Sequence, residues 1–314
     1  MLGCVLAAAA VPAIGPPGQA PAGGSPRCFG AAARDPARPC HNPALRLSVT
    51  PAPSVAARSP NAACRTVAQE GPLRLCTFGV ATEQAEQTVV LVGDSHASHW
   101  RAAVEHLALA RRWTGISLAR TSCPLARAVR DIPEPQRSRC VRWNRAVLRW
   151  FTQHPDIAIV FTGELSGGRG VIARPGADKF QARVSGFLRA WRALAPTVRH
   201  IVVIRDTPKS RPPGGVAACV AGAVARRRDA GEDCASPRES SLDPDPAAVA
   251  ARRLGGARAQ VLDMTDLFCD ERLCYPVIGG VLAYKDSNHL TRVFAETAGP
   301  ILERRTDGLM RRWR

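Results

Sequence analysis

The stretch that decides the fold is residues 88–97, which read Thr-Val-Val-Leu-Val-Gly-Asp-Ser-His-Ala. An apolar, β-branched run of this length is typical of a strand that is buried on both faces of a sheet. The run ends at Gly93, and Asp94 and Ser95 lead directly into a helical stretch. A strand, a tight turn and a helix in immediate succession indicate a parallel sheet covered by helices.

The same alternation continues along the chain. Strands are expected at residues 89–92, 115–118, 157–161, 201–204 and 260–262. Helices are expected at 98–112, 138–154, 179–194, 246–254 and 291–312, with the last interrupted near Pro300 because proline disrupts helical hydrogen bonds. The sequence therefore predicts an α/β fold, a three-layer α/β/α domain with a parallel five-stranded sheet. In such a sheet, ligands bind beyond the carboxyl ends of the strands.

The composition is that of a folded and strongly basic protein. Of 314 residues, 46% are hydrophobic and 22% are charged, and the formal net charge is +17. Only three of the 43 basic residues are lysine, and the arginines are spread along the whole chain rather than gathered in one stretch. Aromatic residues, at 5%, are too few for a base-stacking platform. We therefore expect no nucleic-acid partner, while attraction to an anionic cell envelope is compatible with the charge.

Ten of the eleven cysteines fall in near pairs. The pairs are Cys28 and Cys40, Cys64 and Cys76, Cys123 and Cys140, Cys219 and Cys234, and Cys269 and Cys274, with Cys4 left over. No C-x-x-C occurs and no histidine spacing matches a zinc site, so disulfides are favoured over a metal. Disulfides persist in oxidising compartments, which favours an extracytoplasmic location. Ten cysteines allow many disulfide connectivities, and our hypothesis is that each cysteine pairs with its nearest neighbour in the sequence.

The chain divides by composition into three parts. Residues 1–14 are apolar, but they are shorter than the roughly 20 residues that span a bilayer and lack the basic start of a standard signal peptide. An atypical export signal, the remnant of a membrane helix and a plain disordered end all fit this segment. Residues 15–63 are a Pro-, Ala- and Gly-rich extension, and residues 64–314 form the α/β domain.

Two turns carry the residues of a candidate active site. Ser95 follows the first strand at the start of a helix, where amide groups stabilise an oxyanion. Taken alone, a G-D-S turn is more simply a helix cap. Residues 286–291 read Asp-Ser-Asn-His-Leu-Thr, again just before a helix. A carboxylate three residues before a histidine can fix the tautomer of the ring, so Ser95, His289 and Asp286 are predicted to form a catalytic triad.

Further short motifs, taken in order, match one known family. They lie at residues 75–79, 89–97, 121–124, 155–157, 205–208, 219–234, 268–274 and 284–291. In these stretches the sequence resembles the SGNH (GDS) hydrolase domain that is fused to membrane acyltransferase-3 enzymes, which O-acylate cell-surface polysaccharides. The resemblance covers roughly residues 64–309 and is more specific than either triad motif alone.

The resemblance implies a flavodoxin-like α/β/α sandwich and ester chemistry, in which a serine forms an acyl-enzyme that water or a sugar hydroxyl resolves. It implies Ser95 as the nucleophile, and it requires no metal and no cofactor. The family usually draws oxyanion donors from a glycine and an asparagine, but residues 119–122 here read Ala-Arg-Thr-Ser and residues 162–164 read Thr-Gly-Glu. The candidate oxyanion donors are therefore the backbone amides of Ser95, Ser122 and Gly163.

Four polar side chains near the strand ends can be interpreted either as functional groups or as structural ones. Glu164 and Asp206 follow the third and fourth strands and are candidates to contact substrate, although bracing a loop is the simpler role for Asp206. His96 and His99 lie three residues apart without a nearby third ligand, so we expect no metal site.

We expect an extracytoplasmic, membrane-associated or secreted serine esterase or O-acyltransferase. Its expected substrates are O-acyl groups, in the first place acetyl, of cell-envelope polysaccharide or glycolipid. The family's multi-helix membrane domain is missing from this sequence, so the chain is expected either to work beside a separate membrane acyltransferase or to act alone. The alternative is a non-catalytic, SGNH-like glycan-binding domain that assists such an enzyme, and the missing asparagine supports it.

Overall fold

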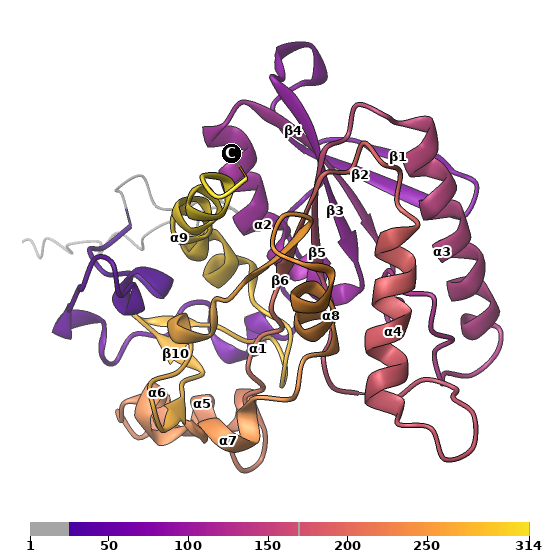
Figure 1. Cartoon of the computed structure of the whole chain (residues 1–314). Coiled ribbons are helices and arrows are strands. Elements are labelled where there is room, and N and C mark those ends of the chain that lie inside the picture. The colour runs from indigo at the N-terminus through magenta and orange to yellow at the C-terminus, as the bar shows by residue number, and fades with distance from the viewer. Residues whose placement is uncertain (1–24, 169, 314) are drawn as a thin grey trace, which may run out of the picture.

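A seven-stranded sheet forms the centre of the molecule (Figure 1). The computed structural model describes residues 25–168 and 170–313. The strand order is β1-β2-β4-β3-β5-β6-β8. The strands are β1 (Val67–Glu70), β2 (Leu73–Gly79), β3 (Gln87–Gly93), β4 (Trp113–Ala119), β5 (Ile159–Gly163), β6 (His200–Ile204) and β8 (Ala259–Leu262).

The five expected strands correspond to β3, β4, β5, β6 and β8, which are all parallel. Numbered along the chain, these five lie in the order 2-1-3-4-5, which is the flavodoxin-like order. The predicted three-layer α/β/α architecture is thus confirmed, but the count of five strands was wrong. β1 and β2 form a hairpin whose second strand pairs antiparallel with β4. Because β1 is exposed at all of its positions, it lacks the apolar pattern that identifies a strand in the sequence.

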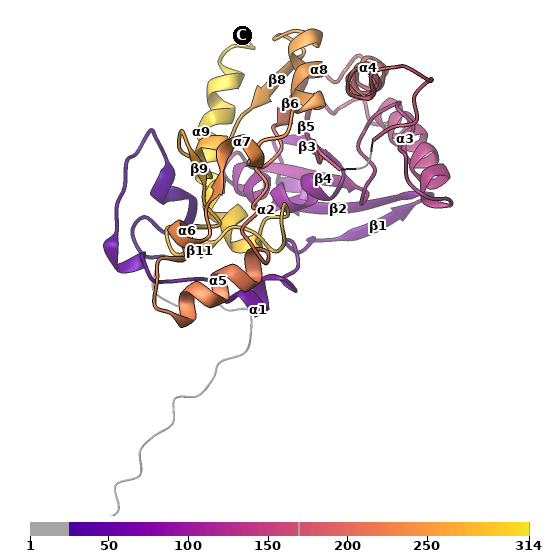
Figure 2. The same cartoon turned by 90° about the horizontal axis from the view of Figure 1, so that it is seen from below.

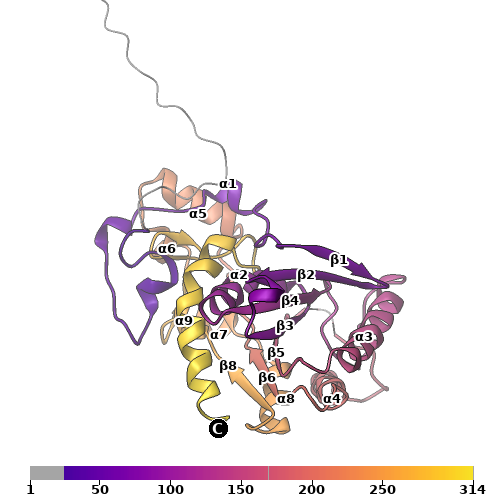
Figure 3. The same cartoon turned by 90° about the horizontal axis from the view of Figure 1, so that it is seen from above.

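Helices cover both faces of the sheet (Figure 1, Figure 3). α2 (Ser95–Ala110) and α9 (Arg292–Met310) lie on one face, and α3 (Gln136–Gln153), α4 (Lys179–Arg192) and α8 (Pro246–Leu254) lie on the other. The shorter helices are α1 (Pro53–Ala56), α5 (Val216–Ala225), α6 (Ala230–Asp233), α7 (Arg238–Ser241) and the 3-10 turns η1 (Gly30–Arg34), η2 (Pro43–Leu45), η3 (Thr82–Gln84) and η4 (Thr265–Leu267). Two small ladders pair β7 (Ser236–Pro237) with β9 (Leu273–Cys274) and β10 (Val277–Ile278) with β11 (Val281–Leu282).

The expected interruption near Pro300 was wrong, because α9 runs through this residue without a break. A proline inside a helix removes one hydrogen bond and crowds the preceding turn, which costs about 3 kcal/mol. Here Phe294 and Ala298 before the proline and Ile301 and Leu302 after it are all buried in one core. Burial of several large side chains at about 1.5–3 kcal/mol each outweighs that cost.

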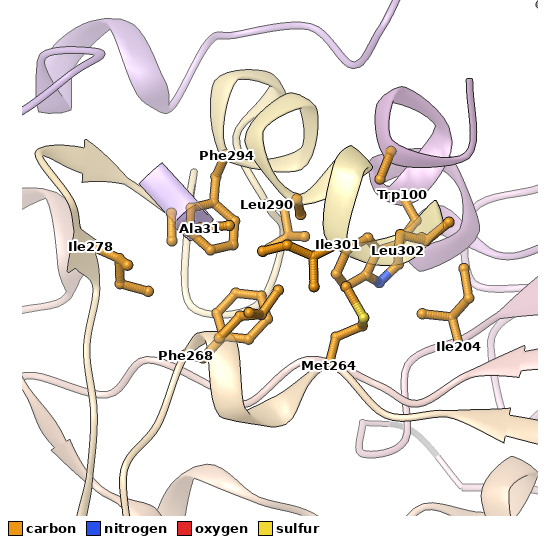
Figure 4. Close-up of a cluster of buried hydrophobic side chains, with 14 of the residues drawn as sticks. Ala31, Trp100, Ile204, Met264, Phe268, Ile278, Leu290, Phe294, Ile301 and Leu302 are labelled. Carbon is orange, nitrogen blue, oxygen red and sulfur yellow. The ribbon is translucent and has the colours of Figure 1, made fainter. Parts of the chain in front are cut away.

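Apolar side chains fill the space on both sides of the sheet, since successive residues of a strand point to opposite faces. Val89 and Leu91 of β3 contribute to the core under α2 and α9, whereas Val90 and Val92 contribute to the core under α3, α4 and α8. Figure 4 shows part of the first core, in which Trp100 of α2 lies near Ile301 and Leu302 of α9.

Residues 25–63 pack against the α/β domain and contain only short helices. Figure 2 shows this segment, in indigo, on the side of the molecule that carries α6. The Gly30 amide donates to the Gly279 carbonyl at 3.0 Å, and the Ala31 amide donates to Thr297 Oγ1 at 3.0 Å. The apolar segment 1–14 and Cys4 lie outside the described residues.

The described residues form five disulfides, which follow the predicted nearest-neighbour pairing. They join Cys28 to Cys40, Cys64 to Cys76, Cys123 to Cys140, Cys219 to Cys234 and Cys269 to Cys274. Within residues 25–168 and 170–313, no helix combines the length and the apolar character needed to cross a membrane.

Candidate active site

The turn that carries Ser95 lies at the switch point of the sheet, between β4 and β5. Gly93 ends β3 and pairs with Ala119 of β4 and Gly163 of β5. Its φ of +151° favours glycine, and a Cβ at this position would lie 2.1 Å from the Gly163 carbonyl oxygen. The chain can therefore turn sharply into α2 here, which places Ser95 at the carboxyl edge of the parallel strands, where ligands bind in this fold class.

Asp94 fixes the start of α2, which begins at Ser95, three residues before the expected start of that helix. One carboxylate oxygen of Asp94 accepts from the His96 amide at 2.8 Å, and the other accepts from the Leu165 amide at 3.1 Å. Burial raises the pKa of Asp94 despite these hydrogen bonds. The aspartate thus ties the helix start to the loop after β5.

The structure brings together Ser95, His289 and Asp286. Ser95 Oγ lies 2.9 Å from His289 Nε2, and His289 Nδ1 lies 2.8 Å from Asp286 Oδ2. The order of groups is that of a nucleophile, a base and an orienting acid. Ser95 is half-buried, while the side chains of His289 and Asp286 are 32% and 54% exposed.

Asp286 is held as a carboxylate by its own turn. Its Oδ1 accepts from the Asn288 and His289 amides at 2.9 and 2.8 Å. Partial burial would raise the pKa of Asp286, but the hydrogen bonds from the His289 ring and the two amides outweigh it and lower the pKa to about 2. An ionised Asp286 keeps the proton of the neutral His289 ring on Nδ1, so that Nε2 is free to accept from Ser95.

The three candidate oxyanion donors surround the nucleophile turn. Ser95 occupies the first position of α2, and the Gly163 Cα faces the first turn of that helix, since a Cβ there would lie 3.4 Å from Ala97 N. The Arg120 amide donates to the Gly93 carbonyl at 3.1 Å, which brings the turn that contains Ser122 beside Gly93. Ser122 has a φ of +59°, and the neighbouring Cys123 is disulfide-bonded to α3.

Glu164 and Asp206, which the sequence offered as substrate contacts, are buried, with 2% and 7% of their surface exposed. Neither carboxylate oxygen of Glu164 has a hydrogen-bond partner among the described residues. Burial, followed by the charges of Asp94 and Asp245, raises the pKa of Glu164 well above its ordinary value. Asp206 accepts from the His96 ring, from both Ser166 N and Ser166 Oγ, and from the Thr207 amide. This placement favours a supporting role for both carboxyls.

Sequence reasoning missed a buried link that runs behind the triad. His96 Nδ1 lies 2.5 Å from Asp206 Oδ1, and His96 Nε2 lies 3.0 Å from Asn288 Oδ1. The signal in the sequence was that Asp206 follows a strand while His96 and Asn288 adjoin the triad residues. Which of these residues meet depends on the strand order, which the sequence does not reveal.

His99 lies one turn further along α2 and is also buried. Its Nδ1 accepts from the Leu290 amide at 3.4 Å, and burial, followed by the charges of His96 and His289, lowers its pKa well below the ordinary value. His99 is therefore neutral. Across the described parts of the chain, no group of three or more His, Cys, Asp or Glu side chains is arranged to hold a metal ion.

A flavodoxin-like α/β/α domain that brings a Ser, a His and an Asp together at its switch point has the side-chain arrangement that serine hydrolases use. A family model described as "SGNH domain (fused to AT3 domains)" matches residues 63–304, and the chain belongs to this family. The predicted family resemblance is thus confirmed.

Among the solved structures with a similar fold is the lipopolysaccharide acetyltransferase periplasmic domain of Salmonella ser. Paratyphi A. The TM-score is 0.53 at 10% sequence identity, and the match covers 74% of this chain and 90% of that chain. At this identity the likeness concerns the fold alone. None of the curated proteins matches the sequence.

Proposed function

We propose that this chain is an extracytoplasmic serine esterase or O-acyltransferase that acts on acyl esters, in the first place acetyl esters, of cell-envelope polysaccharide or glycolipid. The observation that carries the proposal is the hydrogen-bonded series Ser95 Oγ, His289 Nε2, His289 Nδ1 and Asp286 Oδ2, with contacts of 2.9 and 2.8 Å. Membership of the SGNH family supports the same chemistry.

In the proposed first half-reaction, Ser95 Oγ attacks the ester carbonyl while His289 Nε2 takes the hydroxyl proton. The tetrahedral oxyanion is met by backbone amides at the start of α2 and from the Ser122 turn or Gly163. His289 then gives its proton to the leaving alcohol, and an acyl-Ser95 ester remains. In the second half-reaction, His289 takes the proton from water or from a sugar hydroxyl as that oxygen attacks the acyl group. The bond between the acyl carbon and Ser95 Oγ then breaks, and His289 returns the proton to Ser95 Oγ.

A groove of about 610 Å³ lies at the turn after β4, and we propose that the acceptor binds there. Its lining includes Arg120, Thr121 and Ser122 of the turn after β4, together with Arg74 of β2. The Arg120 amide donates to the carbonyl of Gly93, which precedes Ser95 by two positions in the sequence. The triad residues themselves do not line the groove. The lining holds arginine but no acidic residue, which suits a hydroxyl-rich glycan that carries anionic groups.

The cysteines support the proposed extracytoplasmic compartment. Five disulfides persist in an oxidising space, and the similar Salmonella domain is described as periplasmic. That domain is described as part of a lipopolysaccharide acetyltransferase, and a membrane acyltransferase is the partner that we propose for the present chain as a donor of acyl groups.

The test is esterase activity of the purified chain on p-nitrophenyl acetate, with Ser95→Ala as the decisive variant. Loss of the nucleophile should lower the rate by at least about 10³-fold. Ser98→Ala is the matched control, because it removes a half-buried hydroxyl one turn further along α2. The control should stay within about twofold of the wild type. Equal rates for Ser95→Ala and the wild type would contradict the proposal and favour a glycan-binding domain.

A further inference from the structure

His96 is a deeply buried side chain behind the triad. Only 1% of its surface is exposed, and its ring centroid lies 5.0 Å from that of His289. Its two ring nitrogens reach in two directions, to Asp206 after β6 and to Asn288 on the loop of the triad histidine. The ring therefore connects the sheet to that loop.

Both nitrogens of His96 face hydrogen-bond acceptors. Nδ1 lies 2.5 Å from a carboxylate oxygen of Asp206, and Nε2 lies 3.0 Å from the amide oxygen of Asn288. A neutral imidazole has one N–H and one bare nitrogen, so it can satisfy only one acceptor, whereas an imidazolium donates to both. The geometry thus calls for a positively charged ring.

We propose that His96 is a positioning residue of the active site, whose imidazolium holds Asn288 and thereby sets Asp286 and His289 against Ser95. The proposal rests on the proposed function, since it concerns the geometry of the same triad. Burial alone would lower the pKa of His96, but the charge and hydrogen bond of Asp206 outweigh burial and raise the pKa to about 9.

Asn288 is the residue through which this link acts on the triad. Its backbone amide donates to Asp286 Oδ1, and its carbonyl accepts from Thr207 Oγ1 at 3.1 Å. Asp286 and His289 are otherwise partly exposed on their loop, so few contacts fix their distance from Ser95. A displacement of about 1 Å at such a site can cost about 10²-fold in rate.

The surroundings of His96 support one positive charge. The charged and titratable groups that face it are Asp94 at the start of its own helix, Asp206 from the loop after β6, His99 one turn further along α2 and His289 from the last loop. Asp206 is in turn held by Ser166 after β5. His99 is neutral and adds no competing charge, whereas the carboxyls of Asp206 and Asp94, from two different elements, favour a positively charged His96.

The first experiment measures the protonation of His96 directly. In ¹H–¹⁵N spectra of histidine-labelled full-length protein at pH 7, one ring should carry protons on both nitrogens, and His96→Gln should remove that signal. The signal should titrate near pH 9. A bare nitrogen on His96 at pH 7 would overturn the proposal, because the ring would then not donate to Asn288. This readout needs no enzymatic activity, so it separates the proposal from the proposed function.

The second experiment measures the consequence for catalysis. We expect His96→Gln to lower kcat on p-nitrophenyl acetate by about 10–100-fold with KM within about threefold, and to slow fluorophosphonate labelling of Ser95 in proportion. His106→Gln is the matched control, since this half-exposed histidine lies on the same helix and pairs with Glu303. In the wild type, the labelling rate should fall as the pH rises through about 9, where His96 loses the Nε2 proton. His96→Gln should lack this fall.

A variant at the other end of the link guards against misfolding of His96→Gln. Asn288 is a half-buried loop residue, and Asn288→Leu removes the side-chain oxygen that accepts from His96 Nε2. His96 itself is unchanged in this variant. It should lower kcat by a similar factor, and Asn288→Asp, which keeps an acceptor oxygen, should recover part of the loss. An unchanged kcat in Asn288→Leu would overturn the proposal. No esterase activity in the wild type would instead count against the proposed function, whatever the spectra show.

Discussion

The two halves of the candidate site are built in opposite ways. Ser95 stands on a turn in the middle of the sheet, and its neighbours Asp94 and His96 are almost completely buried. His289 and Asp286 stand on a loop near the end of the chain, and about a third and a half of their side-chain surfaces are exposed. The nucleophile is thus held by the core, while the base and its carboxylate are held by a small number of hydrogen bonds.

This contrast separates stability from activity. The turn of Ser95 is fixed on both sides by strand pairing of Gly93 with Ala119 and Gly163, so its geometry persists as long as the sheet does. The loop of His289 depends on contacts such as Thr207 Oγ1 to the Asn288 carbonyl and the Ser210 amide to the Ser287 carbonyl. We expect substitutions of buried residues beside the Ser95 turn to alter mainly the stability of the protein. Substitutions on the loop that carries Asp286 and His289 should alter mainly the rate of ester cleavage.

The largest effect on the loop side is expected from Asp286→Asn. The amide lacks the charge that orients and stabilises the His289 ring, so kcat on p-nitrophenyl acetate should fall by about 10²–10⁴-fold. The melting temperature should change little, because the side chain is 54% exposed. Since the pKa of Asp286 is about 2, the wild-type carboxylate should stay ionised across the assay range, and its protonation should not limit the rate above about pH 4.

The matched control for this variant is Asp266→Asn, another exposed carboxylate, which pairs with Arg305 of α9. It should leave kcat within about twofold of the wild type. Similar rate losses in Asp286→Asn and Asp266→Asn would erase the contrast between the loop and the rest of the surface.

The fold and the meeting of the triad could be predicted because they depend on local patterns. The apolar run at residues 89–92 and the G-D-S turn place Ser95 at a strand end, and the aspartate three residues before His289 lies within one turn of it. Parallel strands gather such turns at one edge of the sheet. The disulfides followed from spacing for the same reason, since each closes a short loop between neighbours in sequence.

The supporting contacts could not be predicted in this way. The pairing of His96 with Asp206 joins residues 110 positions apart and depends on β6 lying where it does in the sheet. The burial of Glu164 depends on which face of β5 it continues, because a shift by one residue would reverse the direction of its side chain. The exposed strand β1 gave no apolar signal at all, since it is held by pairing with β2 rather than by burial.

Among the buried groups beside the nucleophile turn, Glu164, which directly follows β5, is expected to affect stability. We expect Glu164→Gln to raise the free energy of unfolding. Burial raises the pKa of Glu164 above its ordinary value of 4.5, so the folded protein keeps a proton that the unfolded chain releases. The wild type therefore loses stability as the pH rises from 4.5 toward the folded pKa, and glutamine, which does not titrate, avoids this loss. We expect the free energy of unfolding of the variant to rise relative to that of the wild type between pH 5 and pH 8, measured by urea unfolding.

Glu83→Gln, at an exposed position in η3, is the control for the same charge change and should leave the pH dependence as it is. A constant difference between Glu164→Gln and the wild type from pH 5 to pH 8 would mean that Glu164 is ionised in the folded state. A raised KM in Glu164→Gln would instead support contact with substrate and would break the contrast between the two halves.

The smallest effect is expected from Thr207→Val, and it tests the contrast from the loop side. The substitution keeps the shape of the side chain and removes the hydroxyl that donates to the Asn288 carbonyl at 3.1 Å. One such hydrogen bond contributes about 1 kcal/mol to stability, while its loss frees the loop and should lower kcat by about 3–10-fold.

Thr114→Val in β4 is the matched control, because the Thr114 hydroxyl is buried and has no hydrogen-bond partner among the described residues. The control should keep kcat and should not lose stability, since it removes an unpaired buried polar group. If Thr207→Val lowered the melting temperature strongly and left kcat unchanged, the loop would be part of the core, and the division between a sheet-held nucleophile and a hydrogen-bonded loop would fail.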